Sequence, residues 1–470
     1  TDGVNMTRTN KQGAYGLRTS SDKSKLVYLT VPSGYEVEST RGFIPRFYRR
    51  VTAPTSVEQV QRHDFTLKKV NNDRHIMIVS ADMHIRNRAM IKTTSSATPS
   101  ICPPKGELDS TTFRRTYLKA LRDYVKALPA GVPVYGMNLG DMTQESHWTN
   151  ANKATLANFV NVCERGGMPI QTFHAIGNHD HDKAIGMDTE ADHSFRAAFG
   201  PTYYSYNIGD CHFVVLDDVL YTGSSNYTAE ITEAQMAWLE QDLKHVPKDK
   251  LIIIGVHFAT SRRNRPTSHI ANYRELYALL DGYNVRILSG HSHNNYTTTI
   301  SETIEENTLG AVMGAYWNGE ELCNDGSPRG YAVYEIEGNR IANWYYKGTA
   351  YPKEYQMYLY GPGQAVSEQY RDGLIFNIFN WHSTWTVEVR EDDAAWTTLP
   401  SGSNLKYEMD RRAYDFMYGD TKPEHRPTAE PETNNDHMFY YEPSSATWSE
   451  VTVKASDPYG NVYTESIRNE

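Results

Sequence analysis

Side chains of Asp, Asn and His stand directly after apolar runs at five places between residues 75 and 295. They occur in Asp82-Met83-His84, Gly140-Asp141, Gly177-Asn178-His179-Asp180, Gly255-Val256-His257 and Gly290-His291-Ser292-His293. Their carboxylate oxygens, amide oxygens and imidazole nitrogens bind borderline divalent ions such as zinc, manganese and iron. These donors are too many for one tetrahedral ion, but they suit two ions that share a bridging carboxylate. Two ions about 3.5–4 Å apart can activate a hydroxide and bind the oxygens of a phosphoryl group.

The apolar runs before these residues are typical of buried strands. The run 75–80 is apolar with a β-branched bias and breaks into Asp82-Met83-His84, which predicts a strand whose carboxyl end presents a carboxylate and an imidazole. Similar runs occur at 133–139, 169–173, 213–216, 251–254 and 285–288, and segments with helical spacing lie between them at 113–128, 154–162, 235–243 and 274–280. Strands that alternate with amphipathic helices predict an α/β layer architecture.

The segments on either side of this alternating region have an all-β pattern. The turn residues and alternating runs of residues 1–70 predict a small Ig-like or transthyretin-like sandwich. The runs 331–336 and 341–346 predict a hairpin that completes the second sheet of the central domain. Strand-like runs after residue 355 predict a C-terminal sandwich with a closing hairpin. The predicted domains are 1–70, 71–350 and 351–470.

The composition excludes several classes of protein. The chain has 470 residues, 39% of them hydrophobic, and a formal net charge of -10. No stretch approaches the roughly 18 consecutive apolar residues of a membrane span, and the acidic balance argues against a nucleic-acid scaffold. The four cysteines are widely spaced and form no CxxC pair, so we expect free buried thiols and no thiolate metal site.

The five motifs, in this order, resemble those of the calcineurin-like metallophosphoesterase superfamily. The flanking segments are similar to a bacterial envelope type with N- and C-terminal β domains, through Val31-Pro32-Ser33-Gly34-Tyr35 and Gly330-Tyr331-Ala332-Val333-Tyr334. The resemblance implies an α/β (α+β) fold with a four-layer β-sandwich core flanked by all-β domains at both ends.

The resemblance also implies a set of metal ligands and catalytic residues. One ion would be held by Asp82, His84 and His293, the second by Asn178, His257 and His291, and Asp141 would bridge the two. His179 would act as the general acid that protonates the leaving alkoxide, and Asp180 would orient its imidazole. A metal-bridging hydroxide would attack a phosphate mono- or diester without a covalent protein intermediate.

The identity of the two metal ions stays open between Mn, Fe and Zn. Purple acid phosphatases of this superfamily carry a Tyr three residues after the bridging Asp, to ligate ferric iron. Gln144 occupies that position here. We therefore expect no tyrosinate-to-iron charge-transfer colour.

Residues near the motifs could contact the substrate. The candidates are Arg86, Arg262, Arg263 and Trp317, because arginine matches phosphate geometry and an aromatic side chain could wall a pocket. For Trp317, core packing is the favoured alternative to a substrate contact. A small phosphomonoester, phosphodiester, nucleotide or phospholipid headgroup would all fit. A protein serine/threonine phosphatase is an alternative with the same chemistry, and a non-catalytic envelope protein that binds through its β domains is an alternative from another class.

The chain opens on Thr1-Asp2-Gly3-Val4, which resembles the interior of a β-rich module. A removed leader or a shortened sequence would explain this, so the missing leader does not show a cytosolic location. The resemblance to the envelope type implies a secreted or periplasmic location, at the cell envelope. A removed N-terminus could carry a lipid or envelope anchor. The oligomeric state stays open.

Overall fold

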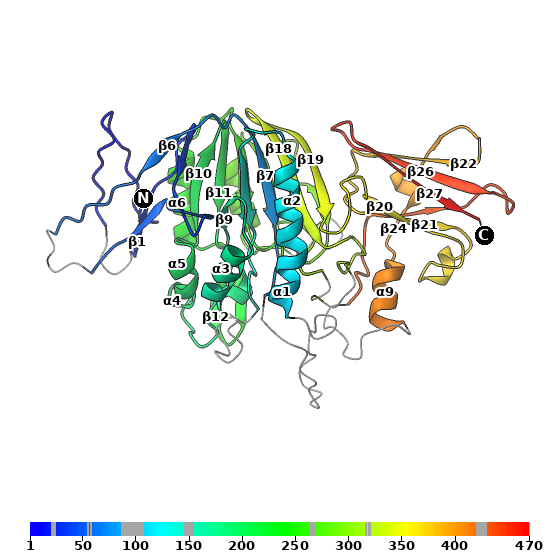
Figure 1. Cartoon of the computed structure of the whole chain (residues 1–470), viewed down its shortest axis with the longest axis horizontal. Helices are drawn as coiled ribbons and strands as arrows, with labels where there is room; N and C mark the ends of the chain where they lie inside the picture. The colour runs from blue at the N-terminus through cyan, green and yellow to red at the C-terminus, as the bar shows by residue number, and fades with distance from the viewer. Residues whose placement is uncertain are drawn as a thin grey trace.

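Two β-sheets face each other in the centre of the molecule, and helices cover their outer faces (Figure 1). The computed structural model describes residues 1–19, 25–53, 56, 59–85, 108–144, 155–262, 269–314, 317, 321–419 and 430–469. Figure 1 shows the strand-rich N-terminal and C-terminal segments at opposite ends of this core.

The first sheet has five strands in the order β19-β18-β7-β8-β9. They are β7 (Arg74–Ser80), β8 (Val134–Asn138), β9 (Gln171–His174), β18 (Gly330–Glu337) and β19 (Arg340–Gly348). β7, β8 and β9 run parallel, so their carboxyl ends lie at one edge of the sheet. β18 pairs antiparallel with β7 and places Ala332 opposite Val79. The predicted hairpin is therefore confirmed, but its placement was wrong: it extends the sheet of the opening strand, because a period of two identifies a strand and not its partner.

The second sheet has six strands in the order β10-β11-β14-β15-β17-β16. They are β10 (Tyr204–Ile208), β11 (Cys211–Val215), β14 (Leu251–Gly255), β15 (Asn284–Ser289), β16 (Tyr296–Thr299) and β17 (Ile304–Thr308). The four inner strands are parallel, and the two edge strands are antiparallel. This sheet presents the carboxyl ends of β14 and β15, which precede the last two motifs.

Alternate side chains of β7 enter two different apolar clusters. Met77 packs between the sheets with Phe213 of β11, whereas Ile78 lies in the cluster of Leu121 and the covering helices. The covering elements are α1 (Asp109–Phe113), a π-helical turn (Arg114–Leu118), α2 (Lys119–Ala127), α3 (Leu156–Arg165), α4 (Asp188–Ala191), α5 (His193–Ala198), α6 (Glu233–Leu243) and α7 (Tyr273–Leu280). The four-layer core that the sequence predicts is confirmed.

The N-terminal segment differs from the predicted sandwich. Its described strands form three two-stranded ladders, which pair β1 (Leu26–Tyr28) with β5 (Tyr48–Arg50), β2 (Tyr35–Val37) with β6 (Leu67–Lys69), and β3 (Ser39–Thr40) with β4 (Ile44–Pro45). Strands of two or three residues are too short to bury two sheet faces against each other. Tyr28, Val37 and Phe47 instead join the central apolar cluster, so this segment is built onto the core.

The C-terminal region is a sandwich of two four-stranded sheets. One contains β20 (Met357–Tyr360), β21 (Leu374–Ile378), β24 (Leu405–Lys406) and β25 (Met438–Tyr441); the other contains β22 (Thr386–Glu391), β23 (Thr397–Thr398), β26 (Glu450–Ser456) and β27 (Val462–Arg468). Phe376 of the first and Val453 of the second share a buried cluster. The helices α8 (Ser401–Asn404) and α9 (Arg411–Tyr418) complete the region. We keep the domain boundary near residue 350 as a proposal.

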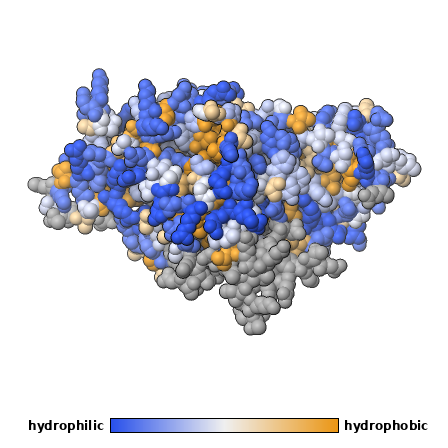
Figure 2. Space-filling view, in the orientation of Figure 1, coloured by the Kyte–Doolittle hydropathy of each residue, from blue (hydrophilic) through white to orange (hydrophobic). Residues whose placement is uncertain are grey.

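The surface and the thiols agree with the composition. Figure 2 shows a largely hydrophilic face on which apolar side chains form small separate patches. Among the described residues, none of the helices is both long and apolar enough to span a bilayer. Cys163, Cys211 and Cys323 are free and buried, as predicted; Cys102 lies outside the described residues.

Candidate dinuclear metal site

The polar residues of the five motifs follow the carboxyl ends of β7, β8, β9, β14 and β15. Backbone hydrogen bonds join the loops, since the His84 amide donates to the Asp141 carbonyl at 2.9 Å and the Gly290 amide donates to the His257 carbonyl at 3.0 Å. The link between the sheets is the Asp82 carboxylate, whose Oδ2 accepts the His291 amide at 2.9 Å. The facing sheets thus bring motifs separated by about two hundred residues into one site.

Five of the predicted metal ligands have a left-handed backbone. Positive φ values occur at Asp82, His84, Asp141, His291 and His293, between 43° and 63°. This region is uncommon for residues other than glycine, although Asp and His occur there several-fold more often than most residues. Each such residue costs roughly 1–3 kcal/mol, and the conformation persists only where the surrounding structure imposes it. The strained backbone positions are therefore those at which the polar side chains converge.

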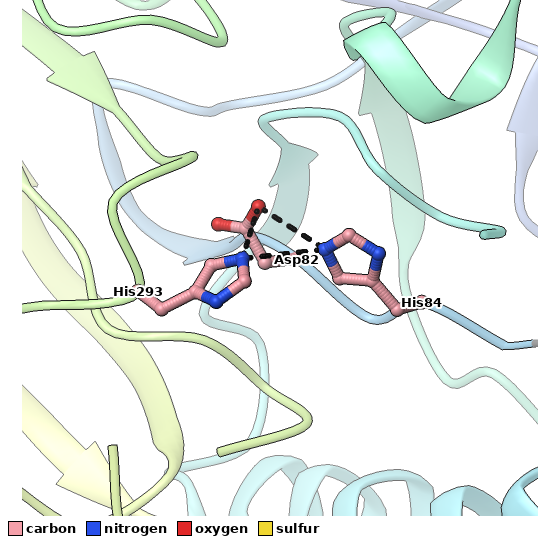
Figure 3. A group of neighbouring side chains, drawn as sticks. All are labelled: Asp82, His84 and His293. Atoms are coloured by element: carbon pink, nitrogen blue, oxygen red, sulfur yellow. Dashed lines mark hydrogen bonds and ion pairs between the residues drawn. The ribbon is translucent and has the colours of Figure 1, made fainter. Parts of the chain in front are cut away.

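Asp82, His84 and His293 form one compact group (Figure 3). His84 Nε2 lies 3.3 Å from His293 Nε2, and Asp82 Oδ1 lies 3.7 Å from the first nitrogen and 3.4 Å from the second. All three side chains are at least nine-tenths buried. These are the three residues predicted to hold the first ion.

Asp141, His257 and His291 form a second group. Asp141 Oδ2 lies 3.2 Å from His257 Nε2, which in turn lies 3.3 Å from His291 Nδ1 and 3.0 Å from Asn178 Oδ1. The same Asp141 oxygen lies 3.5 Å from His84 Nε2 of the first group. One carboxylate oxygen therefore faces both groups, which is the position that a bridging ligand requires.

The spacing of these donor atoms fits metal ions. Two ligands at about 2.1 Å from one ion and at a tetrahedral angle are about 3.4 Å apart, and the separations in both groups scatter around that value. Asp82 Oδ1 is buried and accepts no hydrogen bond from any residue that the structure describes. A buried carboxylate oxygen without such a bond is costly unless a cation faces it. The residues present therefore fit the two ions that the motifs imply.

The electrostatics of the site set the protonation of its histidines. Burial lowers the pKa of His84 to about 4, and burial beside His257 lowers the pKa of His291 to about 3. Burial opposes a charge on His257, but the Asp141 carboxylate prevails and raises the pKa of His257 to about 10. His84 and His291 can thus offer a lone pair at neutral pH, whereas His257 must release a proton when it binds an ion.

The predicted catalytic residues His179 and Asp180 lie in a short 3-10 turn, Asn178–Asp180. The His179 ring centroid is 5.1 Å from that of His84, and its backbone amide donates to Asp141 Oδ1 at 2.8 Å. Asp180 is fully buried and accepts the amides of Thr143 at 3.2 Å and Gly177 at 3.1 Å. Burial, followed by the charge of Asp141, raises the pKa of Asp180 to about 7. These contacts of Asp180 join the two loops that carry Asp141 and His179; its orientation of the imidazole stays a prediction.

Two positioning groups were missed by the sequence analysis. The Asp218 carboxylate, also fully buried, accepts the amides of His257 at 3.0 Å and Phe258 at 2.7 Å. The Leu139 carbonyl lies 2.9 Å from His257 Nδ1 and accepts a hydrogen bond from it, which turns Nε2 toward Asp141. Asp218 closely follows β11. A carboxylate directly after a buried strand is the sequence pattern that could have identified it.

Trp317 packs in the core beneath the first ligand loop, and this position corrects its predicted contact with substrate. The side chain is 1% exposed, its Nε1–H donates to the Met83 carbonyl at 2.9 Å, and its ring packs edge-on against Phe113. Met83 lies between the predicted ligands Asp82 and His84. The indole therefore supports the first ligand loop from inside the core.

Trp317→Phe should lower both stability and metal affinity. Phenylalanine keeps most of the ring packing but leaves the buried Met83 carbonyl without its donor, which costs about 1–3 kcal/mol, and loss of such outer support weakens metal binding roughly 10- to 100-fold. Thermal unfolding and metal titration measure the two effects. Trp448→Phe, in the C-terminal cluster, is the matched control that should leave metal affinity unchanged. Normal metal affinity with a raised KM would instead support a substrate contact.

The predicted arginine contacts have different outcomes. Arg262 is 7% exposed and forms a 2.6 Å ion pair with Glu432 of the C-terminal region. Its guanidinium is therefore already paired, whereas the predicted phosphate contact requires a free one. Arg86 and Arg263 lie outside the described residues.

Several solved structures resemble the chain. A dimetal phosphatase from Danio rerio is 16% identical, with 56% of this chain and 92% of that chain covered and a TM-score of 0.37. A putative 5'-nucleotidase from Staphylococcus aureus is 12% identical, with 84% and 90% covered and a TM-score of 0.36. A 5'-nucleotidase from Candida albicans is 13% identical, with 59% and 52% covered and a TM-score of 0.36. No curated protein sequence matches.

Family models match almost the whole chain. The model of the calcineurin-like phosphoesterase matches residues 77–295 and contains all five motifs. Models of the N terminal and the C terminal of calcineurin-like phosphoesterase match residues 1–70 and 306–463. The chain therefore belongs to the calcineurin-like phosphoesterases, a family of phosphoester hydrolases that depend on two metal ions.

Proposed function

We propose that the protein hydrolyses a phosphate mono- or diester with two metal ions held by Asp82, His84, Asp141, Asn178, His257, His291 and His293. The observation that carries the proposal is the placement of Asp141 Oδ2, 3.5 Å from His84 Nε2 and 3.2 Å from His257 Nε2. A carboxylate oxygen shared between two groups of buried donors is what a dinuclear centre needs, whereas one structural ion would need only one group.

The chain's own residues would bind and orient the ester and supply its proton. When bound, the two ions supply Lewis-acid activation of water and charge neutralisation for the phosphoryl oxygens. The water oxygen forms a new bond to phosphorus, the ester P–O bond breaks, and the departing oxygen takes a proton. His179 is the proposed donor of that proton, because it is partly exposed beside His84 at the rim of the buried donors. Asp180 would hold the His179 turn against the Asp141 loop.

The alternative functions explain the metal site less well. A non-catalytic binding protein has no use for seven converging candidate metal donors, five of them with strained backbones. A protein serine/threonine phosphatase would use the same centre, and a phosphopeptide assay separates it from a small-molecule esterase. The proposed secreted or periplasmic location is tested by fractionating cells that produce the full-length protein.

Removal of metal should abolish hydrolysis reversibly. Purified protein treated with a chelator should lose activity toward aryl phosphate and bis-aryl phosphate, and reconstitution with Mn, Zn or ferrous iron should restore it, because the ions supply the activation of water and the positive charge that faces the phosphoryl oxygens. Elemental analysis should find about two ions per chain at full activity. Full activity with one ion, or activity that survives complete chelation, would contradict the dinuclear proposal. The ratio of monoester to diester turnover assigns the substrate class.

A further inference from the structure

Two buried asparagines directly follow the loop of His291 and His293, and other parts of the chain hold both of them. Asn294 is 4% and Asn295 1% exposed. The Asn295 side chain also fixes the neighbouring chain, since its Oδ1 accepts the Gly310 amide at 2.9 Å. Because these residues continue the proposed ligand loop, the groups that bind them determine where the loop runs and where its imidazoles point.

A carboxylate of the C-terminal region binds the first of these asparagines and a second loop of the site. Glu432 Oε2 accepts a hydrogen bond from Asn294 Nδ2 at 2.8 Å and from the Arg262 guanidinium at 2.6 Å. Arg262 lies five residues after His257, so one oxygen atom joins the loops of the last two motifs. Hydrogen bonds between charged groups are shorter and stronger than those between neutral groups. Glu432 is buried, so water competes little for these bonds.

The segment around Glu432 holds this carboxylate in place. We call residues 430–436 the strap. The Glu432 amide donates to the Asn324 carbonyl at 2.9 Å, and its second carboxylate oxygen, Oε1, accepts the Asn434 amide at 2.8 Å. Backbone and side chain of Glu432 are thus both fixed, so the two loops of the site settle against an acceptor whose position the strap defines.

The second asparagine is connected to the C-terminal region through Asp325. Asp325 Oδ2 accepts the Asn295 amide at 2.6 Å. The Asp325 carbonyl in turn accepts hydrogen bonds from Asn377 Nδ2 and Asn435 Nδ2, each at 2.8 Å. Asn377 belongs to β21 and Asn435 to the strap. The C-terminal region therefore holds both residues that follow His293, by two separate sets of hydrogen bonds.

We propose that the strap is a positioning element of the metal site, and that Glu432 is the residue through which it orients the loops of the last two motifs for metal binding. The inference rests on the proposed phosphoesterase function and gives the C-terminal region a part in it. Coupling between two binding events is reciprocal: if the docked strap raises metal affinity, bound metal stabilises the docked strap by the same factor. A strap that served only the stability of the fold would show no such coupling.

Hydrogen exchange of the unaltered full chain tests this coupling. After chelator-stripped protein is loaded with Zn²⁺ or Mn²⁺, whichever binds more tightly, the strap amides should exchange at least about 10-fold more slowly. The turn at residues 457–461 is the internal control. It also contacts the central domain, through Asn461 Nδ2 and Asn343 Oδ1 at 2.8 Å, and its exchange should not change. Equal exchange of the strap with and without the ions would overturn the proposal.

Glu432→Gln should weaken metal binding without a change in side-chain size. Glutamine offers one acceptor oxygen in place of two, so either the Asn434 amide or the two loops then face a second donor. Titration of the same ion should show an affinity about 10- to 100-fold lower, and the protection of the strap on loading should fall by the same factor. Glu408→Gln is the matched control. It makes the same change at a buried glutamate that accepts the Ser367 amide at 3.1 Å, and it should alter neither quantity.

The outcomes separate this proposal from the one beneath it. An unaltered chain that binds no ion, or a loaded chain that does not hydrolyse aryl phosphate, would overturn the phosphoesterase function itself. Metal-dependent turnover with unchanged exchange of the strap would overturn only the positioning role. A Glu432→Gln variant with lower stability but normal metal affinity would do the same. Because the exchange is measured on the unaltered chain, a misfolded Glu432 variant does not remove the test.

Discussion

Asp141→Asn should lower kcat/KM for an aryl phosphate by at least about 100-fold, as loss of a shared metal ligand requires. Asparagine can keep Oδ1 as the acceptor of the His179 amide, so the loop geometry survives. The atom that changes is Oδ2, which faces His84 at 3.5 Å and His257 at 3.2 Å. An amide nitrogen has no lone pair to share between two ions. We therefore expect the variant to fold normally and to hold fewer than two ions.

Three measurements define this result: thermal unfolding, elemental analysis and the aryl phosphate rate. Asp123→Asn makes the same chemical change in an exposed ion pair with Lys119 on α2 and should alter neither metal content nor rate. Folded Asp141→Asn protein with two ions and unchanged turnover would show that Asp141 does not bridge.

The convergence of the proposed metal donors could be predicted from the sequence because each motif combines two independent signals. An apolar run of strand length predicts a buried strand, so the residue that follows it lies at the edge of a sheet. Asp and Asn are rare within strands, and the side chains of Asp, Asn and His are suitable metal ligands. Asp82 and His293 show how far this reaches: they are about two hundred residues apart, yet Asp82 Oδ1 and His293 Nε2 lie 3.4 Å apart. Their proposed joint role follows from two facing sheets that bring the carboxyl ends of β7 and β15 together, not from any local pattern.

Other features could not be predicted, for physical reasons. The left-handed backbone of His84 is imposed by tertiary contacts, such as the bond of its amide to the Asp141 carbonyl. The pairing of Arg262 with Glu432 joins residues 170 positions apart, and an arginine in a loop has the same pattern whether solvated or buried. The N-terminal strands alternate like a sandwich, but their buried side chains pack on the core, and alternation does not reveal which surface covers a strand.

His179→Ala should lower the hydrolysis of an alkyl phosphate by about 10²- to 10⁴-fold, the usual contribution of a general acid. The same substitution should affect a nitrophenyl ester far less, since nitrophenolate leaves readily without a proton. The His179 backbone amide donates to Asp141 Oδ1 at 2.8 Å, and alanine keeps that amide. The variant should therefore retain two ions, so that a change in leaving-group dependence reports on proton transfer alone.

The measurement is the slope of log kcat/KM against the pKa of the leaving group, with metal content determined on the same samples. The slope should steepen in His179→Ala, because the departing oxygen then carries its full charge. His193→Ala, an exposed histidine on α5, should leave the slope unchanged. An equal loss for alkyl and nitrophenyl esters would mean that His179 acts before the P–O bond breaks, by positioning the phosphoryl group. In that case the proton reaches the leaving oxygen from another donor, and the mechanism proposed for His179 is wrong.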